Sequence, residues 1–159
     1  MAKAWKVEGI KPKKSYRWNA AVILPVKVEE VYAWAEYIHD PDNIKELHNM
    51  RISIKRLRYS MEFFAINYGK AFDDFLQVWV DLQELVGEIH DCDIIQDVLT
   101  GYLQNLREDA NADAIGINAL ILRYREIRKT KYHALLLQWD ELEQTDFKGR
   151  LLETINQSK

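Results

Sequence analysis

A row of basic side chains recurs at helical spacing between residues 48 and 58. His48, Arg51, Lys55 and Arg58 are three or four residues apart, so they would lie along one edge of an α-helix. Guanidinium groups present paired donors to phosphate or carboxylate oxygens, and a lysine ammonium supplies a compact positive charge. Because cations at these spacings repel one another on a bare helix, the row calls for anions to neutralise it. This pattern indicates that the protein binds a polyanion and that no covalent bond is made or broken.

The neutralising anions have two conceivable sources. One is the protein itself, since Glu62 follows Arg58 by four residues and further acids occur downstream: Asp73, Asp74, Asp81, Glu84, Glu88, Asp91 and Asp93. For a generic run of charges, a salt-bridged helix face is the more frequent explanation. The other source is a polymer with a negative charge on every unit, which would match cations spaced by helical turns. The residues alone leave both explanations open.

A second basic segment lies between residues 123 and 131. It holds five cations against Glu126, a net charge of +4: Arg123, Arg125, Arg128, Lys129 and Lys131. On a helical wheel, Arg128 and Lys131 project into or beside an apolar face. A lysine in an apolar stripe is costly unless it reaches solvent or meets an anion, and both explanations are equally good here. Arg123, Arg128 and Lys131 are therefore secondary candidates for the same polyanion.

The histidines do not suggest catalysis or metal binding. His39, His48, His90 and His133 are far apart in the sequence, and the consecutive residues 90–93 would splay around a helix. The sequence also has no glycine-rich phosphate loop, nucleophile elbow or triad spacing. We expect a protein that is not an enzyme and has no cofactor or metal. His48 is better explained as a hydrogen-bond donor to phosphate, stronger when protonated.

Helices must position these side chains, because all three prolines precede residue 42. Residues 43–68 form a predicted helix whose core face lies next to the basic row: Leu47, Met50, Ile54, Leu57, Met61 and Phe64. Other helices are predicted from about Asn19 or Pro25 to 39, over 71–90, from Asp91 to about 105, over 112–142, and briefly after Thr145 or Asp146. Residues 108–113 are predicted to be a polar break. The fold class predicted is all-α, an antiparallel bundle of about five to six helices.

The charge distribution and the composition restrict the ligands and the cellular location that we expect for the protein. Residues 1–20, with six cations and one acid, are predicted to form a basic N-terminal arm, and residues 21–159 the bundle domain. The whole chain has a net charge of −3, and it shows neither a broad basic surface nor a base-reading motif, so nucleic acid is the less favoured ligand. No apolar run approaches the roughly 20 residues that span a bilayer. A single cysteine, Cys92, fits a reducing cytosol, so we expect a cytoplasmic protein without membrane association.

Two segments of the chain carry a family resemblance. Residues 47–64, LHNMRISIKRLRYSMEFF, closely resemble the signature of the CHAD family, the conserved histidine α-helical domain. Its approximate pattern, HxxRxxxKRLRYxxExF, is matched at His48, Arg51, Lys55, Arg56, Leu57, Arg58, Tyr59, Glu62 and Phe64. Residues 82–93, LQELVGEIHDCD, are similar to a second recurrent segment of the family, LQxxLGxxxDxDV. The resemblance covers residues 40–99.

The resemblance implies a CHAD-like helical fold that binds inorganic polyphosphate through basic side chains lining a groove or pore. Phosphate or sulfate ions would occupy such a site in a crystal, and association with polyphosphate granules would follow in the cell. His48, Arg51, Lys55 and Arg58 are favoured as ligands, because motif and helical wheel agree on them. Arg56 matches the motif but lies off the row, so it would serve another phosphate or a salt bridge.

The chain departs from the family pattern in one respect. The family usually holds two related helical bundles, each with its own basic helix, whereas this sequence has one copy. Either one bundle suffices or two chains pair, and we favour a homodimer with a symmetric contact. The alternatives to polyphosphate binding are a module for nucleic acid or another polyanion and a structural bundle for protein interaction. Lys11, Lys13 and Lys14 are most simply a solvated arm.

Overall fold

The structure is a computed structural model that describes residues 3–106 and 111–157. Its elements follow in the order α1 (Tyr16–Tyr32), η1 (Ala35–Tyr37), α2 (Ile44–Phe64), η2 (Ala65–Asn67), α3 (Lys70–Gln104), α4 (Asn111–Gln144) and α5 (Phe147–Asn156), where η marks a short 3-10 turn. The described residues contain no strand. The prediction of an all-α bundle is confirmed.

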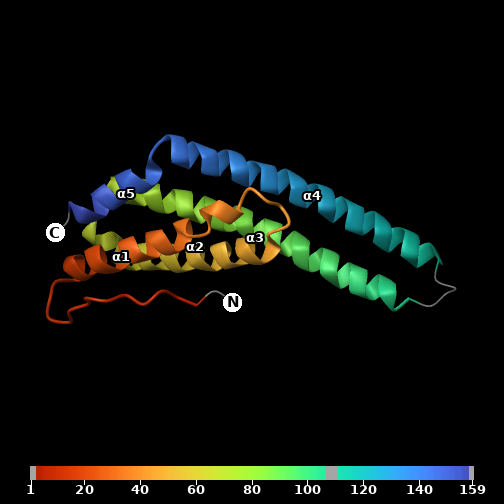
Figure 1. The fold of residues 1–159 in the computed structure, drawn as a ribbon, viewed down its shortest axis with the longest axis horizontal. Helices are drawn as coiled ribbons and strands as arrows, with labels where there is room; N and C mark the ends of the chain where they lie inside the picture. Colours follow the sequence, from red (N-terminus) through yellow and green to blue (C-terminus); the bar gives the residue numbers. More distant parts are fainter. Residues whose placement is uncertain (1–2, 107–110, 158–159) are drawn as a thin grey trace.

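Two long helices form the frame of the molecule (Figure 1). Helices α3 and α4 lie side by side and run in opposite directions, with α2 packed against the first part of α3 and α1 against α2. The short helix α5 covers the end of the bundle that holds the start of α3. At the other end, the α3–α4 hairpin projects beyond α1 and α2 (Figure 1). Only the body of the hairpin therefore belongs to a multi-helix core.

The core face predicted for α2 is confirmed. Leu47, Met50, Ile54, Leu57, Met61 and Phe64 are all buried. They pack with aromatic and aliphatic side chains from the other helices, the largest being Trp79, Trp139 and Phe72. Burying one such side chain stabilises a fold by about 1.5–3 kcal/mol, so this face fixes the rotation of α2. The neighbouring row of cations is consequently held at the edge of the core.

Helix α3 corrects the prediction of two helices divided at Asp91. It runs unbroken for 35 residues, and Asp91 is an exposed residue within it. Ile89 and Cys92 on either side are buried against neighbouring helices, so packing continues through this point. An aspartate favours a helix start, but that preference is weaker than the burial of the turns on both sides of it.

The ends of the other helices also differ in part from the predictions. Helix α1 begins earlier than expected, because the Ser15 hydroxyl accepts a hydrogen bond from the Trp18 amide at 3.1 Å. It ends at Tyr32 and not at residue 39, and Pro25 lies in its interior, where one helical hydrogen bond is lost. Of the predicted polar break, residues 108–110 lie outside the described residues and 111–113 belong to α4.

The predicted cap of the final helix is confirmed at Asp146. Its carboxylate accepts from the Gly149 amide at 3.2 Å, and its backbone is left-handed, with φ 46°. A β-carbon on Gly149 would come within 2.4 Å of the Asp146 carboxylate, so only glycine fits beneath this cap.

No described helix combines the length and the apolar character required to cross a membrane.

Candidate functional site

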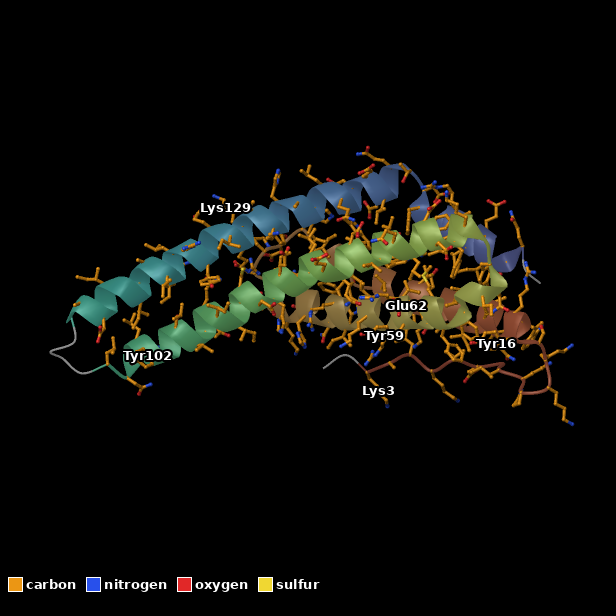
Figure 2. The ribbon with its side chains drawn as sticks, turned by 180° about the vertical axis from the view of Figure 1, so that it is seen from behind. Lys3, Tyr16, Tyr59, Glu62, Tyr102 and Lys129 are labelled. Carbon is orange, nitrogen blue, oxygen red and sulfur yellow. The ribbon has the colours of Figure 1, made fainter. Side chains whose placement is uncertain are left out.

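The predicted basic row lies on the edge of α2 that borders α3. Arg51 and Arg58 are half-buried there and Lys55 is exposed. Tyr59 and Glu62, which flank the row, are labelled in Figure 2. The aromatic ring of Tyr59 lies 5.8 Å from the Lys55 ammonium and 5.5 Å from the Arg58 guanidinium carbon, so it holds both cations along the edge.

A trough of about 270 Å³ lies between α2 and α3 beside this row. Helix α2 lines it with Arg51, Lys55 and Tyr59, and α3 lines it with Gln83, Glu84, Gly87, Glu88 and Asp91. A β-carbon on Gly87 would lie 3.9 Å from the Arg51 Nε atom, so a larger side chain there would enter the space beside the guanidinium. The trough thus carries both signs of charge, whereas the expectation was a groove lined by basic side chains.

Arg51 and Lys55 face this trough without carboxylate partners. Within residues 3–106 and 111–157, no ion pair joins either side chain to an acid. The carboxylates of Glu84 and Asp91 line the same space and make no ion pair with a described residue either. The repulsion between Arg51 and Lys55, one helical turn apart, is therefore not relieved by a direct internal contact.

Two further cations of the predicted set are paired in half-exposed ion pairs. Arg58 Nε lies 2.8 Å from Glu62, and Lys131 Nζ lies 2.7 Å from Glu88. Because Glu88 also lines the trough, the second pair places a cation of α4 beside the cations of α2. Exposed ion pairs contribute about 0–1 kcal/mol, so an incoming phosphate can compete for either cation.

Arg128 is held away from the trough. Its guanidinium bonds the carboxylate of Asp93, which is 8% exposed, and donates to the carbonyl of Pro41 at 2.9 Å. All three residues line a different cavity, of about 280 Å³, at the junction of α3, α4 and the connection before α2. The structure thus gives Arg128 a role in joining these elements.

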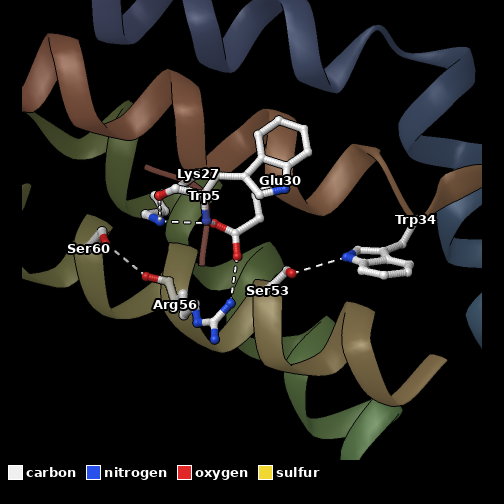
Figure 3. Close-up of polar contacts among 7 residues, drawn as sticks. All are labelled: Trp5, Lys27, Glu30, Trp34, Ser53, Arg56 and Ser60. Carbon is white, nitrogen blue, oxygen red and sulfur yellow. Dashed lines mark hydrogen bonds and ion pairs between the residues drawn. The ribbon is translucent and has the colours of Figure 1, made fainter. Parts of the chain in front are cut away.

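Arg56 belongs to an ion-pair cluster around the buried Glu30 of α1 (Figure 3). The Glu30 carboxylate, 2% exposed, accepts from Arg56 at 2.7 Å, from Lys27 at 2.9 Å and from the Trp5 amide at 3.3 Å. Burial by itself would raise the pKa of Glu30, but the hydrogen bonds from Lys27, Arg56 and Trp5 outweigh burial and lower it. Of the two roles open to Arg56 from the sequence, the structure provides the salt bridge.

His48 lines a third cavity, of about 590 Å³, beyond the end of the trough. Its Nδ1 atom is buried and has no hydrogen-bond partner in the described part of the chain. Burial, and then the charges of His90 and Arg51, lower the pKa of His48. The lowered pKa favours the neutral imidazole. We had expected the protonated ring, which would donate the stronger hydrogen bond to phosphate.

Arg123 lies on the exposed surface of α4, toward the tip of the hairpin. No ion pair to it occurs among the residues described. It does not line the trough. The structure thus places four of the predicted residues in or next to the trough: Arg51, Lys55, Arg58 and Lys131. The other four lie elsewhere: Arg56, Arg123, Arg128 and His48, the last in the neighbouring cavity.

Sequence reasoning did not assign a wall of the trough to α3. Gln83 and Gly87 entered the prediction only as matches to the second family segment, and the acids of α3 were expected only as general neutralisers. A signal was nevertheless present, because Glu84, Glu88 and Asp91 repeat the spacing of Arg51, Lys55 and Arg58. Two neighbouring helices can align rows of side chains that have the same spacing and opposite charge.

A family model for the CHAD domain matches residues 17–100, which is more than half of the chain. The chain belongs to the CHAD family. The matched residues include all but the first residue of α1, the whole of α2 and most of α3, and therefore both walls of the trough. Membership relates the chain to polyphosphate binding in general. Neither a curated protein nor a solved structure matches the chain.

Within the described ranges, no three or more histidine, cysteine, aspartate or glutamate side chains form a cluster that could hold a metal ion.

Proposed function

We propose that the protein binds inorganic polyphosphate in the trough between α2 and α3, without a catalytic step. The observation that carries this proposal is the position of Arg51 and Lys55, one helical turn apart beside an open trough and without a carboxylate partner among the described residues. A polyphosphate chain supplies negatively charged oxygens at every unit, and guanidinium and ammonium groups bind such oxygens well.

Arg58 and Lys131 would extend the contact on either side of this pair. Each would exchange a half-exposed carboxylate, Glu62 or Glu88, for phosphate oxygens. The unpaired carboxylates of Glu84 and Asp91 would repel the ligand from the α3 wall, so the chain would run along α2. This arrangement predicts binding that is sensitive to salt.

The remaining candidates have smaller parts in this proposal. His48 lies beyond the end of the trough, and it would hold the ligand more strongly after taking up a proton. Arg123 would contact only a ligand long enough to leave the trough. Arg56 and Arg128 act in the fold, because each is paired with a buried carboxylate.

A protein-interaction bundle is the second candidate function. The mixed charge of the trough favours it, since a partner protein can match both signs where a polyanion matches one. Nucleic acid is a weaker alternative, because the basic surface at the trough is narrow. A chain with the proposed activity would act in the cytoplasm at polyphosphate granules, as a homodimer and without metal or cofactor.

A direct titration separates these functions. Purified protein is titrated with long-chain polyphosphate, single-stranded DNA and duplex RNA, each at two salt concentrations. We expect salt-sensitive binding that is tightest for polyphosphate. Equal or tighter binding of either nucleic acid would overturn the ligand assignment, and no binding of any polyanion would favour the protein-interaction bundle.

A further inference from the structure

The tip of the α3–α4 hairpin lacks a covering layer. Among its described residues, 94–106 and 112–120, none is fully buried. Large apolar side chains are instead open to solvent, with Val98 64% exposed and Tyr102 61% exposed. Because two helices can cover only one stripe of each other, a hairpin of this composition needs a further layer.

One face of this tip continues directly from the trough. The ion pair of Lys131 with Glu88 marks the edge at which α4 and α3 meet beside the trough. On α3, steps of three and four residues from Glu88 lead through Asp91 to Val98 and Tyr102. The same steps back along α4 lead from Lys131 to Leu120, also exposed. We define Val98, Tyr102 and Leu120 as the tip face.

The charges beside the tip face indicate what covers it. Residues 91–104 of α3 contain three acids and no base, whereas residues 123–131 of α4 contain five bases and one acid. Asp93 is already paired with Arg128, and Lys131 with Glu88, so the other charges of the two segments are those open to a partner. Asp97 on the first helix and Arg123 on the second are both exposed, and Asp97 also lines the cavity that Arg125 and Arg128 of the same chain line. A partner of one charge sign would be repelled by one of the two helices. A second copy of the chain is attracted by both, since a two-fold contact places the acids of each copy against the bases of the other.

We propose that the tip face docks the tip face of a second copy of this chain. This inference rests on the homodimer of the proposed function and names its surface. Four helices, two from each copy, would bury Val98, Tyr102 and Leu120 between them, with Asp97 of each copy beside the basic segment of the other. Apolar burial would provide the association energy and the opposite charges the orientation.

The test is the mass of the protein by light scattering and sedimentation over a wide concentration range. We expect the wild-type chain to be a dimer. Val98→Asp with Tyr102→Asp should raise the dimer dissociation constant at least about tenfold, which is about 1.4 kcal/mol of association energy. Because both residues are exposed, the helical circular dichroism should not change. Leu137→Asp is the matched control, since Leu137 is 58% exposed on α4 outside the tip and its loss should leave the mass unchanged.

A charge exchange adds a second readout. Asp97→Arg and Arg123→Asp should each weaken the dimer, and the double variant should regain part of the loss. A wild-type chain that stays monomeric would contradict the proposal that the tip face docks a second copy. A dimer unaffected by Val98→Asp with Tyr102→Asp would contradict it as well. Polyphosphate titration of the same samples keeps the two proposals apart. A monomer that binds polyphosphate would contradict only the docking proposal. A dimer that does not bind polyphosphate would contradict only the ligand assignment.

Discussion

The imidazole rings of His48 on α2 and His90 on α3 lie in contact, with their centroids 4.6 Å apart. They join the two helices just beyond the trough that Arg51 and Lys55 line. A proton on the His48 ring would place a positive charge beside His90 and close to Arg51. The contact therefore couples the packing of α2 on α3 to pH.

Acidification should weaken the fold through His48. Its pKa is lowered in the folded state by burial and then by the charges of His90 and Arg51, so the unfolded chain binds this proton more readily. Stability is therefore complete above the unfolded pKa of about 6.5 and falls as the pH drops from there toward the folded pKa. Chemical denaturation between pH 8 and pH 5 measures this. His48→Phe should flatten the slope, whereas His133→Asn, at an exposed site, should leave it unchanged.

Polyphosphate should shift the same equilibrium in the opposite direction. A bound chain near the end of the row would favour the imidazolium form of His48 and raise its pKa. Nuclear magnetic resonance titration of the His48 ring with and without polyphosphate measures this shift, with His133 as the internal control. A pKa of His48 that is the same in both samples would place the ligand away from this end of the row.

The Glu30 cluster should be a major source of stability and unimportant for binding. Glu30→Ala leaves the cations of Lys27 and Arg56 without their shared carboxylate, and we expect a loss of about 3 kcal/mol in the free energy of unfolding. Glu8→Ala removes the exposed pair with Lys6 and should change it by less than about 0.5 kcal/mol. Denaturant unfolding tests both. The proposed site predicts that folded Glu30→Ala binds polyphosphate with the same affinity as the wild type. A loss of polyphosphate affinity in the folded variant would argue against the site.

The basic row should act on ligand binding and hardly on stability. Arg51 and Lys55 repel each other and have no carboxylate partner among the described residues, so Lys55→Gln should leave the free energy of unfolding within about 0.5 kcal/mol of wild type or raise it. Thermal and denaturant unfolding provide the measurement. A loss of more than about 1 kcal/mol would show that Lys55 has a structural role beyond its contact with the Tyr59 ring and would weaken its assignment to a ligand.

The sequence predicted the helical class, the core face of α2 and the cap at Asp146, because each depends on local spacing or on one side chain. It did not predict that α3 is continuous through Asp91, since that depends on burial against other helices. The site shows the same division. The row from Arg51 to Arg58 follows from helical spacing, but the carboxylates opposite it, and the pairing of Arg128 with Asp93, depend on which helix faces which.

The most direct test is the affinity of long-chain polyphosphate for the wild-type protein and for Arg51→Ala with Lys55→Ala, measured by calorimetry at low and moderate salt. Lys11→Ala with Lys14→Ala is the control, because it removes the same number of charges from the exposed arm. We expect the first pair to weaken binding at least about tenfold, or about 1.4 kcal/mol, and the control pair to weaken it much less. Equal losses in the two variants, or no loss in either, would contradict binding in the trough.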